Sequence, residues 1–133
     1  LSTDDRKKLL RIIYQHLKPG GKLLLDVFSK ETFDSFREGQ TWESCPSGGF
    51  WREHGYIALS GHYKYQDLIT LEQTTIISDT EVATYYIWNT CFTQNSLIEE
   101  VNKSGFNVSG IFENVAGEKS HHNSPTIAIL LEK

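Results

Sequence analysis

The 133-residue sequence lacks long apolar runs and has no surplus of basic residues. No stretch of 18 or more apolar residues occurs, so we expect no membrane-spanning helix. The N-terminal residues also lack the basic-then-apolar order of a secretory signal. The formal net charge is -4, whereas nucleic acids and anionic membranes attract basic surfaces. We therefore expect neither nucleic acid nor an anionic membrane as the main partner. The length of the chain predicts a single domain.

Cysteine is scarce, and its spacing excludes the usual metal sites. Cys45 and Cys91 lie far apart and do not have the short spacing of zinc ligands. Two unpaired thiols in a chain without a visible signal are typical of a reducing compartment, so the sequence predicts a cytoplasmic location. The adjacent pair His121-His122 lies in a polar stretch with no third ligand nearby. We therefore predict no metal site.

Two catalytic and cofactor-binding motifs are missing as well. The sequence has no G-x-S-x-G nucleophile elbow, which argues against a hydrolase of that type. The pairs Gly20-Gly21 and Gly48-Gly49 do not follow a strand and open a helix, as a dinucleotide cradle must. We therefore expect no cofactor-binding residue in this chain.

The most informative segment is Leu17-Lys18-Pro19-Gly20-Gly21 and the apolar run that follows it. Proline and glycine end the helix expected over residues 2–17, and residues 23–28 predict a strand covered on both faces, as in a parallel sheet. A further helix is expected over residues 30–38. In open α/β sheets ligands bind beyond the carboxyl ends of the strands, so Asp26 and Phe28 are candidate binding residues there. Asp26 could equally hydrogen-bond a neighbouring backbone group as a structural residue, and a core role is the favoured alternative for Phe28.

In the middle of the chain, apolar residues recur at every second position. After a loop expected over residues 40–50, the segments 50–65, 68–78 and 82–92 alternate between apolar and polar residues and are joined by short turns. This pattern predicts an antiparallel meander that is rich in aromatic residues. Thr93 then begins a helix that ends at Gly105, and strands over 106–113 and 126–131 are expected to pair antiparallel.

In this order, the elements resemble the C-terminal part of a class I S-adenosylmethionine-dependent methyltransferase. The resemblance rests on the L-K-P-G-G sequence before the strand at residues 23–28, on the helix that runs from Phe92-Thr93 to Gly105-Phe106, and on the closing apolar strand. It extends to an insert seen in one bacterial branch of the family, through the segments 50–52, 63–65 and 86–89. The resemblance covers nearly all of the chain.

The resemblance implies an α/β fold in two parts. Residues 1–41 and 92–133 would form the C-terminal half of a Rossmann-like sheet, and residues 42–91 would form an inserted antiparallel β meander over the mouth of the active site. The implied reaction moves a methyl group from S-adenosylmethionine to a small molecule. The family's glycine-rich turn and acidic residue are absent, so cofactor binding would need an N-terminal half encoded upstream, and this fragment is expected to be inactive alone.

The candidate acceptor-binding residues are mostly aromatic side chains of the insert, which combine apolar shape with polar tips. Cross-strand packing is the favoured explanation for any single one of them, whereas we expect at least one or two of the set to line the pocket. His54 is a weak candidate for a general base, because imidazole titrates near neutral pH, although methyl transfer from a sulfonium chiefly requires alignment. The substrate-binding candidates are Asp26, Phe28, Trp51, Tyr63, Tyr86 and Trp88.

A second interpretation makes the chain a non-catalytic module that binds a ligand or another protein. The aromatic meander would then be the binding surface, supported by the α/β elements. Under either interpretation, the strand at residues 23–28 would have an open apolar edge, and such edges invite pairing. We therefore expect association with an N-terminal half of the enzyme or self-association.

Overall fold

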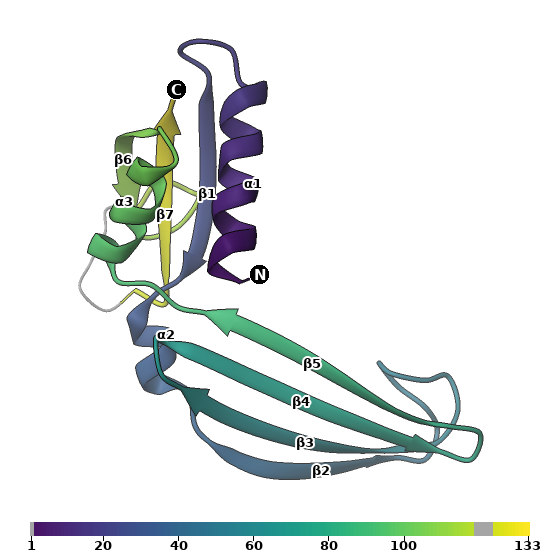
Figure 1. Ribbon diagram of the computed structural model, residues 1–133. Coiled ribbons are helices and arrows are strands. Elements are labelled where there is room, and N and C mark those ends of the chain that lie inside the picture. Colours follow the sequence, from purple (N-terminus) through teal and green to yellow (C-terminus); the bar gives the residue numbers. More distant parts are fainter. Residues whose placement is uncertain (1, 119–123) are drawn as a thin grey trace. The chain divides into compact units, whose positions relative to one another are not determined.

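The computed structural model describes residues 2–118 and 124–133, so the predicted pair His121-His122 lies outside the described residues. The chain divides into two compact units, which are considered separately. The α/β unit comprises Leu1–Asp34 and Cys91–Lys133, and the β unit comprises Ser35–Thr90 (Figure 1). The β unit thus begins seven residues before position 42, where the sequence pattern places the start of the insert.

The helices of the α/β unit mostly begin and end where their sequence signals predict. Helix α1 (Thr3–His16) is capped by Ser2, whose hydroxyl accepts a bond from the backbone N–H of Asp5 at 3.1 Å. Helix α3 (Gln94–Lys103) has a similar capping box between Thr93 and Ser96 and ends before Gly105, whose φ is +97°. These caps satisfy N–H groups that a helix leaves unpaired at its start. Helix α2 (Lys30–Ser35) is three residues shorter than predicted.

A three-stranded antiparallel sheet carries the core of the α/β unit. Its strands are β1 (Lys22–Phe28), β6 (Asn107–Phe112) and β7 (Thr126–Glu132), in the order β1-β7-β6. The predicted antiparallel pairing of the last two strands is confirmed. Ile129 and Leu131 of β7 are fully buried, and they pack with residues of α1 and α3 such as Leu10 and Val101. The apolar run of β7 thus forms the centre of this sheet.

Strand β1 differs from the prediction of a strand covered on both faces. Its residues alternate between half-buried and exposed, and Leu24 and Phe28 remain 47% and 45% exposed. Its one neighbour among the described residues is β7, and that pairing is antiparallel rather than parallel. Leu23, Leu25 and Val27 pack against the core, whereas the opposite face and one edge are uncovered within the described part of the chain.

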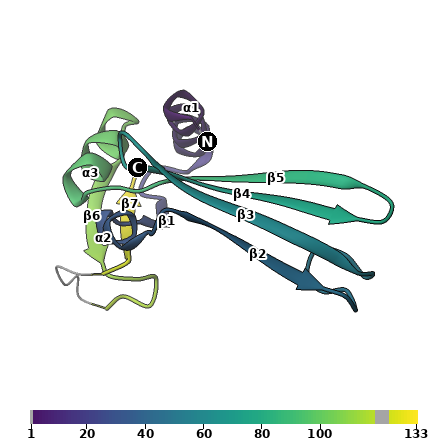
Figure 2. The ribbon, with the colours of Figure 1, turned by 90° about the horizontal axis from the view of Figure 1, so that it is seen from below.

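The β unit is a four-stranded antiparallel meander with the order β2-β3-β4-β5. Its strands are β2 (Gly39–Cys45), β3 (Tyr56–Tyr65), β4 (Ile69–Ser78) and β5 (Val82–Thr90), and Figure 2 shows β2 and β5 at the two edges. The pattern of the sequence predicts the meander but not β2, because it predicts a loop over residues 40–50. The loop signals of Pro46 to Gly49 in fact follow the strand. Thr41 and Trp42 favour strand geometry and pair with β3.

Candidate functional site

The register of the β unit assigns its side chains to two faces. Residues directly opposite each other on paired strands lie on the same face, and alternate residues lie on opposite faces. Trp42, Leu59, Thr75 and Thr84 follow one another across the sheet, and the Thr75 and Thr84 hydroxyls hydrogen-bond at 3.0 Å. We call this the open face. Its other members are Gln40, Ser44, Ile57, Gly61, Tyr63, Tyr65, Ile69, Leu71, Gln73, Ile77, Val82, Tyr86, Trp88 and Thr90.

The opposite face is covered by the loop of residues 46–55. Trp51 packs against the buried cluster of Tyr56, Ala58 and Ile76 and stacks on Tyr85 with ring centroids 4.8 Å apart. Arg52 extends this cover through bonds to the Tyr85 hydroxyl at 3.0 Å and to Glu81 at 2.6 Å. The loop therefore supplies this sheet with its core, which leaves the open face available for binding.

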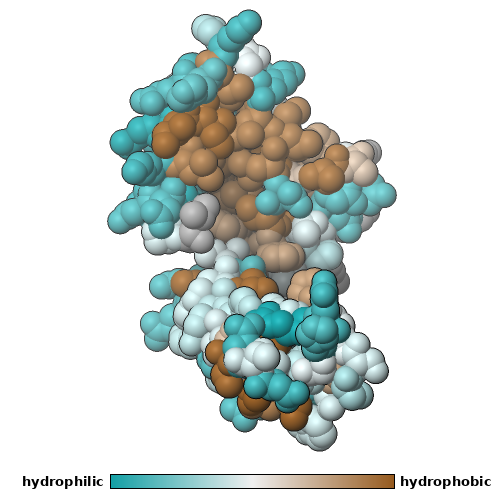
Figure 3. All heavy atoms as spheres, turned by 90° about the vertical axis from the view of Figure 1, so that its right-hand side faces the viewer, coloured by the Kyte–Doolittle hydropathy of each residue, from teal (hydrophilic) through white to brown (hydrophobic). Residues whose placement is uncertain are grey.

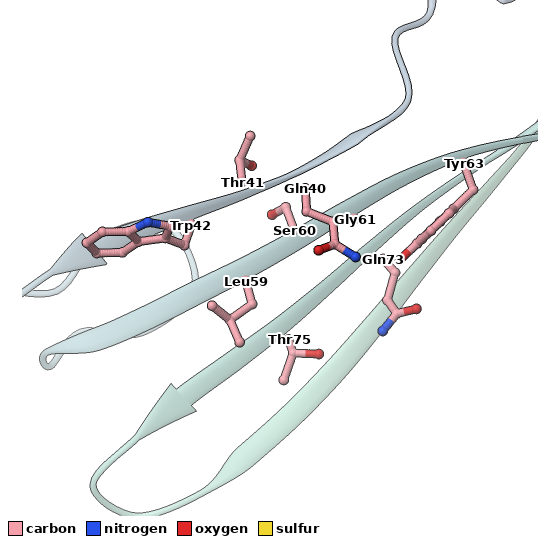
Figure 4. A pocket seen from close by; sticks show the side chains of 9 residues that line it. All are labelled: Gln40, Thr41, Trp42, Leu59, Ser60, Gly61, Tyr63, Gln73 and Thr75. Carbon is pink, nitrogen blue, oxygen red and sulfur yellow. The ribbon is translucent and has the colours of Figure 1, made fainter.

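A hollow of about 510 Å³ lies over Gly61, and seven of its nine lining residues belong to the open face, whereas Thr41 and Ser60 belong to the other face. Its lining residues are all uncharged: Gln40, Thr41, Trp42, Leu59, Ser60, Gly61, Tyr63, Gln73 and Thr75. In Figure 4, Trp42 and Tyr63 stand toward opposite ends, with the Gln40 and Gln73 amides between them. Amides and hydroxyls both donate and accept hydrogen bonds, and aromatic rings offer apolar faces. This arrangement suits a neutral polar ring better than a charged group.

The Tyr63 side chain occupies the space beside Gly61, so a larger residue at position 61 would displace it. A Cβ added to Gly61 would lie 2.5 Å from the Tyr63 hydroxyl oxygen and 2.9 Å from two of its ring carbons. The Tyr63 side chain therefore lies against the Gly61 backbone and forms one wall of the hollow. The sequence pattern singles out Tyr63 but misses Gln40, Trp42 and Gln73. The alternation of Gln40 and Trp42 within the predicted loop is the signal that could have found the first two.

The other candidates from the insert do not form one cluster. Tyr86 and Trp88 lie on the open face and are 58% and 53% exposed, and Trp88 packs on Tyr65 at 5.4 Å between ring centroids. Trp51 lies on the covered face, where it packs as part of the core. His54 is exposed on the loop of residues 46–55. Tyr63 is thus the candidate that lines the hollow.

Asp26 and Phe28 lie near the carboxyl end of β1, which is held by backbone bonds on both sides. The backbone N–H of Phe92 donates to the carbonyl of Phe28 at 2.8 Å. The backbone N–H of Lys30 donates to the carbonyl of Phe92, also at 2.8 Å. On the other side the N–H of Ser29 donates to Pro125, and the buried Ser29 hydroxyl donates to the Ser124 carbonyl at 2.5 Å. Asp26 and Phe28 themselves are exposed. The structure therefore provides a rigid strand end with a carboxylate beside it.

The α/β unit has an apolar groove of about 260 Å³ between α1, β1 and α3. Its apolar lining is Leu9, Leu10, Leu25, Val27, Phe92, Leu97 and Val101, and the charged residues Arg6, Asp26 and Glu100 also line it. The guanidinium of Arg6 donates two bonds to the Glu100 carboxylate, at 2.8 and 3.0 Å. Figure 3 shows apolar side chains gathered on the surface of this unit. Leu9 and Leu24 are among its exposed residues.

Two further observations concern metals and membranes. Within residues 2–118 and 124–133, no three His, Cys, Asp or Glu side chains are grouped as metal ligands would be. None of the described helices has the length and apolar composition needed to cross a membrane.

Tyr56 gives the β unit a pH-dependent contribution to stability. A hydrogen bond with Cys45 and burial together raise the pKa of Tyr56 above the ordinary 10.0. The unfolded chain then releases this proton at lower pH than the folded chain does. The contribution is therefore complete below the unfolded pKa and is lost as the pH rises through the folded-state pKa. We expect Tyr56→Phe to flatten the alkaline fall in the free energy of unfolding as the pH rises above the ordinary tyrosine pKa of 10.0, measured by urea titration; an unchanged slope would contradict this.

Several solved structures of methyltransferases are similar to this chain. An S-adenosylmethionine-dependent methyltransferase from Clostridium acetobutylicum matches with a TM-score of 0.72 at 12% identity, over 98% of this chain and 52% of that protein. The CcbJ methyltransferase from Streptomyces caelestis matches with a TM-score of 0.66 at 12% identity, over 98% of this chain and 54% of that protein. A sugar N-methyltransferase from Streptoalloteichus matches with a TM-score of 0.56 at 15% identity, over 99% of this chain and 51% of that protein.

These comparisons establish the fold of the chain. It has the fold of part of an S-adenosylmethionine-dependent methyltransferase, and it spans about half the length of the structures that it matches. The resemblance inferred from the sequence is therefore confirmed at the level of fold. Comparison of the sequence alone finds no matching protein-family model and no matching curated protein.

Proposed function

We propose that this chain is the acceptor-side part of an S-adenosylmethionine-dependent methyltransferase that acts on a small molecule. The observation that carries the proposal is the β1-β7-β6 sheet with an open β1 edge, in a chain that matches half of such enzymes. Fold alone does not define function, so the proposal also depends on the hollow over Gly61. Its chemistry, neutral amides between aromatic rings, is what an acceptor pocket requires.

Neither glycine pair in the described part of the chain fits a cradle for the methyl donor. Gly20-Gly21 leads into β1, and Gly48-Gly49 lies between two strands, so neither glycine pair opens a helix whose N–H groups could hold a ligand. We therefore assign donor binding to residues upstream of this chain, beyond the open edge of β1. The chain's own contribution is to orient the acceptor, which is the main requirement of methyl transfer from a sulfonium.

In this proposal the acceptor lies in the hollow, against Tyr63 and Trp42. The Gln40 and Gln73 amides would fix its orientation, and a sugar-like ring would satisfy both the aromatic walls and the amides. The similarity to a sugar N-methyltransferase agrees with such an acceptor. Asp26, Phe28, Tyr86 and Trp88 remain predicted acceptor contacts and His54 a predicted base, whereas the packing of Trp51 favours a structural role.

Calorimetry with S-adenosylmethionine tests the proposal. We expect no measurable heat of binding with residues 1–133 alone, because the donor cradle is missing. We expect binding in the micromolar range, roughly -8 kcal/mol, with a longer product of the same reading frame that includes the upstream residues. Substituting Tyr63→Ala in that product should weaken acceptor binding and leave donor binding unchanged.

A second candidate function is a non-catalytic module that binds a ligand or protein. The hollow and the open face favour it, because they belong to a unit that folds around its own core. Absence of donor binding by the longer product would decide for this second candidate.

A further inference from the structure

The groove of the α/β unit places an ion pair among apolar side chains. Arg6 of α1 and Glu100 of α3 are only 19% and 14% exposed. The guanidinium donates to the carboxylate from Nε at 2.8 Å and from Nη2 at 3.0 Å. A mostly buried pair adds little net stability, because the cost of removing both charges from water offsets their attraction. What two parallel bonds do provide is a fixed plane for the guanidinium.

The guanidinium of Arg6 lies over the ring of Phe92. Its central carbon is 5.2 Å from the ring centroid, a distance at which a cation is attracted to the face of an aromatic ring. Phe92 is 6% exposed and belongs to the core of the α/β unit. Arg6 therefore links this ring to α1 directly and to α3 through Glu100.

The backbone of Phe92 in turn supports the end of β1. Its N–H donates to the carbonyl of Phe28, and its carbonyl accepts from the N–H of Lys30, both at 2.8 Å. These bonds form a parallel bridge between Phe92 and Ser29. The N–H of Ser29 donates toward β7, to Pro125, so by alternation the backbone groups of Phe28 face the other edge of β1. Phe92 thus supports an edge that no strand covers within the described residues.

We propose that Arg6 and Glu100 form a clamp that acts through Phe92 to fix the carboxyl end of β1. The predicted acceptor contacts Asp26 and Phe28 lie at this end. A displacement of about 1 Å in groups that orient a substrate costs about a hundredfold in rate. Arg6 is therefore a positioning residue, because it acts through Phe92 rather than on a reacting atom.

The importance of the clamp for methyl transfer rests on the proposed function. The clamp itself is tested without donor or acceptor, because its direct effect is on two backbone hydrogen bonds of the α/β unit. Failure of the clamp and failure of the proposed function are therefore distinguishable.

Hydrogen exchange of residues 1–133, followed by NMR, tests the clamp at the amides of Phe92 and Lys30. The double variant Arg6→Met/Glu100→Leu removes both charges and keeps apolar bulk, so neither charge is left unpaired. We expect exchange at these two amides to become about tenfold faster. The melting temperature should change by less than about 3 °C, because a buried pair replaced by apolar side chains costs little stability. Exchange at Leu25, in the middle of β1, should stay the same.

A matched control removes another ion pair from the same helix. Glu99 and Lys103 of α3 lie 3.5 Å apart and are both 71% exposed, and neither lines the groove. The double variant Glu99→Leu/Lys103→Met should therefore leave the exchange of the Phe92 and Lys30 amides unchanged.

Arg6→Lys separates the orientation of the side chain from its charge. Lysine keeps a positive charge near the ring but lacks the planar fork, so we expect exchange at Phe92 and Lys30 to approach that of the Arg6→Met/Glu100→Leu variant. Circular dichroism of each variant confirms that it is folded. Full protection in Arg6→Lys would overturn a clamp that depends on the plane of the guanidinium. Unchanged exchange in Arg6→Met/Glu100→Leu, or an equal rise at Leu25 or in the control, would overturn the inference as well.

Discussion

Replacing Ile129 by alanine is expected to lower the free energy of unfolding of the α/β unit by about 2–5 kcal/mol. Ile129 is completely buried on the central strand β7 and pairs with Leu25 of β1 and Ile111 of β6. Truncation removes buried apolar surface and leaves a cavity that the sheet cannot easily close. Urea denaturation followed by circular dichroism measures the loss.

Leu130→Ala is the matched control for Ile129→Ala. Leu130 is the next residue of the same strand, but it points to the opposite face and is only half-buried. We expect this substitution to cost about 1 kcal/mol, near the typical value for a point mutation. Equal losses at the two positions would contradict a core that lies on the helix-covered face of the sheet.

Gly48→Ala is expected to destabilise the β unit by about 2–4 kcal/mol. Gly48 has a φ of +82°, which is strained for alanine, and an added Cβ would lie 2.2 Å from the carbonyl oxygen of Glu53. The loop of residues 46–55 would have to move, and Trp51 with it. Trp51 would lose its packing on Tyr85, so a change in tryptophan fluorescence should accompany the fall in the melting temperature.

Gly117→Ala separates the two causes of that loss. Gly117 has a similar φ of +86°, but no atom lies within 4 Å of its added Cβ. This control should therefore show only the backbone strain, about 1 kcal/mol. If Gly48→Ala costs no more than Gly117→Ala, the close contact between Gly48 and Glu53 is not an important restraint on the loop.

The sequence predicts the parts of the fold that local chemistry determines. The caps at Ser2 and Thr93 and the helix end at Gly105 depend on neighbouring residues, and each is found at the predicted position. No helical pattern lies between the last two predicted strands, which predicts that they pair antiparallel, and the pairing of β6 with β7 confirms this. The methyltransferase resemblance, inferred from the order of these elements, is confirmed as a fold.

The remaining features depend on tertiary contacts that local patterns do not contain. Strand β2 contains Gly39 and Ser44, which favour loops, and it is stabilised by its pairing with β3. The hollow could not be predicted because it combines Gln40, Gly61 and Gln73 from three strands. The apolar run of β1 indicates burial on both faces, but half of that burial requires neighbours that the described residues do not provide.

Hydrogen exchange at β1 tests most directly whether its sheet continues upstream. The N–H of Ser29 donates to Pro125 of the β7 side, so by alternation the amides of Leu23, Leu25 and Val27 face β7, and those of Leu24 and Asp26 face the open edge. In residues 1–133 alone, we predict fast exchange at Leu24 and Asp26 and protection at the other three. In a longer product that includes the upstream residues, all five should be protected. Fast exchange at Leu24 and Asp26 in that product would contradict a sheet that continues beyond β1.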